Sequence, residues 1–225
     1  MQWELNDDIL VSLNESSGVV EITSTKLSKM HDYNNRTDRV PWFDYRDNIV
    51  SIVVDDNIER IGDFTFMYCK NLSSVLFGDS VKEIGKHAFD HCVSLRTVSF
   101  SDNIERIEDN AFDFCDLYEI NLPNKTPIDD NHNGLNYIGK EAFRFNSGSG
   151  SKSNNTTDEL FYKYREINIP RSLNYIGTGA FSGMLYTFRL VVLNSPEGSQ
   201  LPVPQCILDY VSEHDIRYVL EEEKG

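Results

Sequence analysis

The sequence has little of what usually identifies an enzyme or a nucleic-acid-binding protein. Its 225 residues include only four cysteines and no Cys-x-x-Cys pair, which argues against a zinc or redox site. It has no glycine-rich phosphate loop and no Gly-x-Ser-x-Gly nucleophile turn. Basic residues number 21 against 36 acidic ones, and the formal charge of −15 argues against binding to phosphate backbones. We therefore expect no enzymatic activity, no cofactor and no nucleic-acid partner.

Long hydrophobic runs are also missing. No stretch approaches the roughly 18 apolar residues of a membrane span, so we expect no membrane insertion. The first eight residues, from Met1 to Asp8, lack a basic stretch followed by an apolar one, so the sequence predicts no signal peptide at this start. The apolar share of 40% is nevertheless ordinary for a globular protein and allows a sizeable core.

A repeat of 23 residues is the main feature that is present. The dipeptide Ile61-Gly62 recurs as Ile84-Gly85 and then as Ile107-Glu108, each 23 residues further along. The same step relates three phenylalanines and three cysteines, which are Phe66, Phe89, Phe112, Cys69, Cys92 and Cys115. Interrupted copies follow at 138–143 and 176–181. A fixed period with apolar residues in fixed phase predicts a solenoid, in which stacked coils build one continuous core.

Each repeat also contains a short segment in which apolar and polar residues alternate, as in 72–77 and 95–100. Alternation of this kind is typical of strands. We predict a β-rich α/β fold, a right-handed solenoid with a parallel sheet of about six short strands. The Ile-Gly-x-x-Ala-Phe segment is too short for a full helix and predicts a turn or a single helical turn on the opposite side.

Charges between the strand and the Ile-Gly corner support this register. In stacked coils they form two ladders of alternating sign, Glu59–Lys82–Glu105 and Arg60–Glu83–Arg106. Opposite charges on neighbouring strands favour stacking, and like charges oppose it. Asp56, Asp79 and Asp102, in contrast, stack like on like, either as turn caps or as a cation site.

The terminal segments differ in pattern from the repeats. We expect an N-terminal β cap over 1–48, the solenoid over 49–193 and a C-terminal cap over 194–225. Apolar alternation on both sides of 14–18 predicts a hairpin in the first cap. A short amphipathic helix around 207–211 and a last strand over 216–220 are expected in the second.

The repeated pattern Ile-Gly-x-x-Ala-Phe-x-x-Cys-x-x-Leu-x-x-Val resembles the BspA-like leucine-rich repeat family, over residues 49–193. The sequence departs from it where Asn146 and Met184 replace the cysteine and where insertions at 123–134 and 146–159 break the period. The resemblance implies a cell-surface or secreted protein used in adhesion, although a cytoplasmic location stays open because no leader is seen.

The residues that alternate with the core positions should face solvent and form the outward strand face. Its expected members are Ser51, Val53, Ser74, Leu76, Thr97, Ser99, Glu119, Asn121, Glu166, Asn168, Leu190 and Val192. We predict that this face binds a protein or glycan partner of basic character. The alternative is a structural or accessory module of a larger surface protein, with no ligand of its own.

Three further features have weaker interpretations. Asp129, Asn131 and Asn133, followed by Gly134, match the first half of a calcium loop, but Lys140 occupies the position of the final glutamate, so a polar turn is favoured. His87 and His91 have metal-ligand spacing, yet they lie at ordinary variable positions of the repeat. The repeated cysteines predict a buried ladder of free thiols, because side chains in parallel register point the same way.

Overall fold

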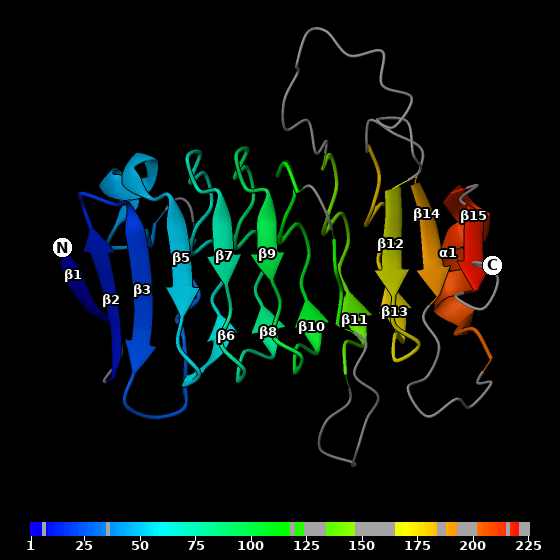
Figure 1. Ribbon diagram of the computed structural model, residues 1–225, viewed down its shortest axis with the longest axis horizontal. Helices are drawn as coiled ribbons and strands as arrows, with labels where there is room; N and C mark the ends of the chain where they lie inside the picture. The colour runs from blue at the N-terminus through cyan, green and yellow to red at the C-terminus, as the bar shows by residue number, and fades with distance from the viewer. Residues whose placement is uncertain are drawn as a thin grey trace, which may run out of the picture.

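The computed structural model describes residues 1–5, 8–34, 37–117, 120–123, 134–146, 165–183, 188–192, 202–214 and 217–220. It is an elongated stack of coils with strands β1 to β3 at one end and helix α1 with strand β15 at the other (Figure 1). The predicted solenoid is confirmed: the described elements are mostly strands, and the repeats pair in parallel.

The first sheet contains six strands in the order β1-β2-β3-β5-β7-β9. Their bounds are β1 (Gln2–Leu5), β2 (Ile9–Asn14), β3 (Val19–Ser24), β5 (Ser51–Val54), β7 (Ser74–Leu76) and β9 (Thr97–Ser99). The first three strands are antiparallel, and the hairpin expected at 14–18 joins β2 to β3. From β3 onward the pairing is parallel, so the N-terminal cap continues directly into the repeats.

The register of the first sheet follows the 23-residue period. Ile52 pairs with Val75, and Val75 pairs with Val98. Ile52 and Val75 are buried, while their neighbours along each strand lie on the opposite side of the sheet. Alternate positions therefore divide into a core face and an outer face, as the sequence predicts.

A second sheet of very short parallel strands lies along the corner of each coil, below the first sheet in Figure 1. Its members, in spatial order, are β13 (Tyr175–Ile176), β11 (Tyr137–Ile138), β10 (Arg106–Ile107), β8 (Glu83–Ile84), β6 (Ile58–Ile61) and β4 (Ser28–Lys29). The sequence pattern predicts no strands here, because segments of two to four residues carry too little alternation to recognise.

The charge ladders fall in this second sheet, in the predicted register. Arg60 pairs with Glu83, and Glu83 pairs with Arg106 across the strands. The Arg60 Nε atom is 3.0 Å from Glu83 Oε1, and Lys82 Nζ is 3.5 Å from Glu59 Oε1. Arg106 binds Glu108 within its own coil. The ion pairs thus connect neighbouring coils, and their contribution is modest because they are partly exposed.

The like-charged aspartates act as turn caps in at least one step of the stack. The Asp56 carboxylate accepts a hydrogen bond of 2.8 Å from the backbone N–H of Asp79 in the next coil. This contact supports the turn-cap interpretation of these residues over a cation site.

A third sheet completes the C-terminal part, in the order β12-β14-β15. Its strands are β12 (Arg165–Ile169), β14 (Phe188–Val192) and β15 (Arg217–Leu220), all parallel. The strand expected near 120–122 is reduced to a single bridge between Asn121 and Asn168. Among the described residues, this bridge is the contact between the segment at 120–123 and the third sheet.

Two helices accompany the sheets. A 3-10 helix, η1 (Phe43–Asn48), precedes β5, and α1 (Gln205–His214) is the C-terminal helix that the sequence predicts. The apolar side of α1 buries Ile207, Tyr210 and Val211 against the last coil. In the described part of the chain, neither helix has the length and apolarity that crossing a membrane requires.

A column of stacked aromatic rings runs through the core, and we call it the aromatic column. Its members, in order, are Trp42, Phe66, Phe89, Phe112, Phe143, Phe181 and Tyr210. Successive ring centroids lie 5.2–6.1 Å apart. Trp42 closes the N-terminal end and donates from its indole to the Thr65 carbonyl, and Tyr210 closes the other end. Both caps therefore extend the repeat contact with a residue from outside the repeats.

The segment after each Ile-Gly corner is a turn, as predicted. Two residues per coil, four positions apart, have positive φ: Phe64 and Tyr68, His87 and His91, Asn110 and Phe114, Glu141 and Phe145, and finally Gly179 and Gly183. The glycine of the Ile-Gly corner is required for a different reason, which is steric. A Cβ at Gly85 would lie 2.7 Å from the backbone nitrogen of Asp63, so the neighbouring coil excludes a side chain there.

Candidate interaction surface

The outward strand face is ordered into two rows that cross β5, β7 and β9. The polar row pairs Ser51 with Ser74 and Ser74 with Thr97. The second row pairs Val53 with Leu76 and Leu76 with Ser99. Val53 is 40% and Leu76 is 52% exposed, so two large apolar side chains lie side by side in solvent.

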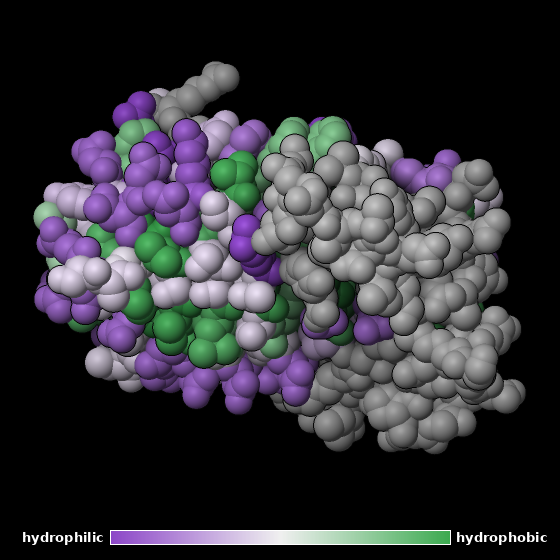
Figure 2. Space-filling view, turned by 45° about the horizontal axis from the view of Figure 1, so that its top comes forward, coloured by the Kyte–Doolittle hydropathy of each residue, from purple (hydrophilic) through white to green (hydrophobic). Residues whose placement is uncertain are grey.

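The rows continue onto the N-terminal cap. Glu21 pairs with Val53, Ser12 with Glu21, and Gln2 with Ser12. Figure 2 shows a band of apolar and near-neutral residues over the part of the molecule that β3 to β9 occupy in Figure 1, with hydrophilic residues along both borders. This arrangement is typical of an interaction surface with an apolar centre and a polar rim.

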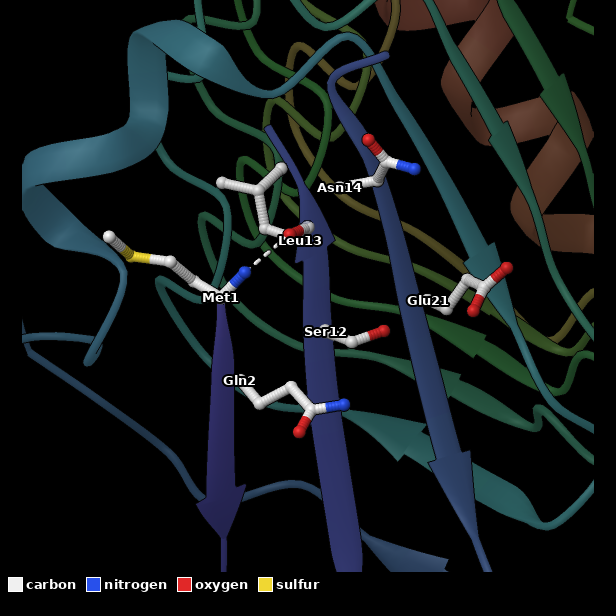
Figure 3. A pocket seen from close by; sticks show the side chains of 6 residues that line it. All are labelled: Met1, Gln2, Ser12, Leu13, Asn14 and Glu21. Atoms are coloured by element: carbon white, nitrogen blue, oxygen red, sulfur yellow. Dashed lines mark hydrogen bonds between the residues drawn. The ribbon is translucent and has the colours of Figure 1, made fainter. Parts of the chain in front are cut away.

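A hollow lies on the cap end of this face. It is open to solvent, has a volume of about 490 Å³, and is lined by Met1, Gln2, Ser12, Leu13, Asn14 and Glu21 (Figure 3). The Met1 amine donates to the Leu13 carbonyl at 2.7 Å. The lining offers one carboxylate, amides and a hydroxyl in an open depression, whereas small-molecule sites are usually enclosed.

Not all C-terminal members of the predicted outward strand face are exposed to solvent. Leu190 and Val192 are fully buried, so the prediction that they face solvent is wrong. Val191 between them is buried as well, so both sides of β14 are covered. Leu190 and Val192 pair with the core residues Ile167 and Ile169, so the predicted phase of this strand is wrong by one residue. Three consecutive apolar residues contain no alternation that would set the phase, and they are typical of a strand buried on both faces.

The other C-terminal members are placed only in part. Asn121 is exposed and forms a parallel β-bridge with Asn168. The side-chain oxygen of Asn168 is buried and has no hydrogen-bond partner among the described residues. Glu166 lies within β12. Glu119 lies outside the described residues, and so do Asp129, Asn131 and Asn133 of the calcium-loop candidate.

The comparisons with known proteins agree with the repeat geometry. The family model for the BspA type leucine-rich repeat region matches residues 41–147 and 130–195, in six copies. The chain belongs to this family. No curated protein matches it.

Solved structures of bacterial leucine-rich repeat proteins share the fold. A leucine-rich repeat protein from Bacteroides ovatus is 20% identical with a TM-score of 0.54, and the match covers 97% of this chain and 52% of that one. The pneumococcal vaccine antigen PcpA is 16% identical with a TM-score of 0.54, covering 89% of this chain and 46% of that one. This chain therefore spans about half the length of either.

The cysteine ladder of the BspA-type repeat is structural. Cys69, Cys92 and Cys115 are buried free thiols, as predicted. The thiols of Cys92 and Cys115 each donate to the phenylalanine carbonyl of the preceding coil at 3.2 Å. Burial raises the pKa of both thiols well above the usual value, which keeps them protonated and poor as nucleophiles or metal ligands.

The two histidines of the repeat turns share one carboxylate. His87 Nδ1 is 2.9 Å from Asp90 Oδ2, and His91 Nδ1 contacts the other oxygen of the same buried carboxylate. Each ring also stacks on an aromatic ring of a neighbouring coil, with centroids 4.8 Å apart for His87 and Phe64. Across the described ranges, no three His, Cys, Asp or Glu side chains are grouped to hold a metal.

Proposed function

We propose that this chain is a non-enzymatic binding module that recognises a protein or glycan partner of basic character through the outward strand face. The observation that carries the proposal is the pair of exposed aliphatic side chains, Val53 and Leu76, in register at the centre of that face. A soluble protein gains nothing from such a pair in isolation, whereas a binding face needs an apolar centre.

The charge of the molecule supports a basic partner. The formal charge of −15 gives a negative field that attracts cationic surfaces and repels anionic ones. Glu21 borders Val53 directly, which places a carboxylate beside the apolar pair. The family resemblance supports a cell-surface or secreted location, where adhesion to such partners would take place.

The test is a binding screen against immobilised matrix proteins, serum glycoproteins and glycans, with wild type beside Leu76→Arg. The substitution places a cation and a longer side chain at the centre of the face. We expect a partner that binds wild type to lose about tenfold or more of its affinity for the variant, because central apolar anchors dominate interfaces.

The matched control is Val93→Arg. Val93 is 52% exposed, the same as Leu76, but it lies in the turn after Cys92 and not on a strand. Both variants should keep the thermal midpoint of wild type. Equal loss in both variants, or no loss in either, would remove the outward strand face as the site. Absence of any partner would favour the structural-module alternative.

A further inference from the structure

One row of side chains in the second sheet changes character along the molecule. At the same position of successive coils it contains Arg60, Glu83, Arg106, Tyr137 and Tyr175. The first members form ion pairs, and the last two are stacked rings with centroids 4.7 Å apart and planes at 12°. The guanidinium carbon of Arg106 lies 3.9 Å from the Tyr137 ring centroid. This cation–π contact joins the charged part of the row to its aromatic part.

Tyr175 ends the row with an open ring. Among the described strands, β13 is the edge of the second sheet, and Tyr175 is 45% exposed. Tyr137 covers one face of the ring in a nearly parallel stack. The exposed area of Tyr175 therefore belongs to its other face and its rim.

Other aromatic rings of this molecule indicate which chemical group binds to an open ring face. Tyr137 receives the Arg106 guanidinium on the face away from Tyr175, and Phe43 receives Arg46 at 3.7 Å and Arg39 at 4.3 Å from its centroid. Guanidinium groups stack well on aromatic faces because they are planar and weakly hydrated. The net charge of −15 adds long-range attraction for a cationic partner.

We propose that the open face of Tyr175 is a docking position for an arginine side chain of a basic protein partner. The arginine would extend the stack Arg106–Tyr137–Tyr175 by one member, with the ring between Tyr137 and the incoming guanidinium. The position lies in the second sheet and is separate from the outward strand face, so the proposed function does not depend on it.

The experiment compares an arginine-rich peptide with its lysine-substituted counterpart of equal length and charge. Each peptide carries a fluorophore and is titrated with the full chain in a fluorescence anisotropy assay. Wild type should bind the arginine peptide about fivefold more tightly than the lysine peptide, since an ammonium gains less from stacking on the ring. Tyr175→Leu should lower arginine binding to the lysine level, whereas Tyr175→Trp should keep the preference.

Tyr68→Leu is the control, because it makes the same substitution in a different ring stack, against His91. It should leave the arginine preference unchanged. Equal binding of the two peptides by wild type, or an arginine preference that survives Tyr175→Leu, would overturn the proposal. Tyr175-dependent binding on a glycan array without an arginine preference would also overturn it, by assigning the ring to a sugar. The assay contains only peptide and this chain, so its failure would leave the role of the outward strand face untouched.

Discussion

At the residue scale, Asn146 shows how a departure from the repeat keeps its contact. Asn146 occupies the cysteine position of its coil and is buried. Its amide donates to the Phe112 carbonyl of the preceding coil at 2.8 Å, and Cys92 and Cys115 make the equivalent bond to the phenylalanine carbonyl of the coil before each of them. Its side-chain oxygen also accepts from the Leu117 N–H at 3.2 Å. The sequence shows the substitution, but only the geometry shows that the donor is preserved.

This equivalence predicts the ranking of two variants. Asn146→Ala removes a donor and an acceptor from a buried site and should lower the free energy of unfolding by about 2 kcal/mol. Asn146→Cys should lower it by about half as much, because the thiol can donate to the same carbonyl. Urea unfolding followed by far-UV circular dichroism gives both values. A cysteine variant no more stable than the alanine variant would contradict the shared role.

The positive-φ turn residues mark a limit of sequence reasoning at the same scale. A positive-φ position can usually be recognised in a sequence because it is glycine. Four of the five coils instead have aromatic, histidine, asparagine or glutamate residues at these positions. Only Gly179 and Gly183 carry the signal, and aligning them with His87 and His91 would have found the rest. The metal-ligand spacing of those histidines is thus a consequence of the turn.

At the element scale, the alternation of apolar and polar residues predicts the repeat strands of the first sheet. Segments without this alternation are either missed as strands or assigned the wrong outward face. The strands β5, β7 and β9 alternate and were predicted with their outward residues. The second sheet was missed because its strands have two to four residues. The wrong assignment of Leu190 and Val192 is a register error of one residue: they pair with the buried Ile167 and Ile169, and an apolar run has no alternation that would set the phase. What covers a strand depends on distant segments, which a local pattern does not contain.

The capping of the last coil by α1 gives a prediction for alkaline pH. The Phe181 N–H donates to the Tyr210 hydroxyl at 3.0 Å, and burial raises the pKa of Tyr210 to about 12 from its ordinary value of 10. Above pH 10 the unfolded chain therefore loses this proton while the folded chain keeps it. The contribution to stability is complete below pH 10 and disappears as the pH rises toward 12.

Tyr210→Phe should separate the two effects of this hydroxyl. At neutral pH it should cost about 1 kcal/mol, because the acceptor for Phe181 is removed while the ring stays. Between pH 10 and 12 the variant should lose less stability than wild type. Tyr33 also has a pKa raised to about 12 by burial, so some alkaline loss should remain in the variant. Parallel alkaline loss in both proteins, measured by urea unfolding, would exclude Tyr210 as a source.

At the scale of the whole molecule, the coils are connected in one dimension, each chiefly to its neighbours. The aromatic column passes through the described coils beside the second sheet, and Phe112 lies at its middle, with ring centroids 5.2 Å from Phe89 and 5.4 Å from Phe143. The first sheet ends at β9 in the same region, and only the Asn121–Asn168 bridge is described beyond it. The second sheet also crosses this region through β10, β11 and β13, so we expect the aromatic column to share the coupling of the two halves with it.

Phe112→Ala should consequently do more than lower stability. The cavity should cost about 3–5 kcal/mol, and weakened coupling at one interface should let the two halves unfold separately. Both tryptophans, Trp3 and Trp42, lie at the N-terminal end with ring centroids 5.8 Å apart, so fluorescence reports that half while far-UV circular dichroism reports the whole. In wild type the two urea transitions should coincide, and in Phe112→Ala they should separate. Phe112→Leu, which keeps most of the volume, should show a single transition at lower urea. Coincident transitions in Phe112→Ala would mean that the sheets, rather than the aromatic column, transmit cooperativity along the molecule.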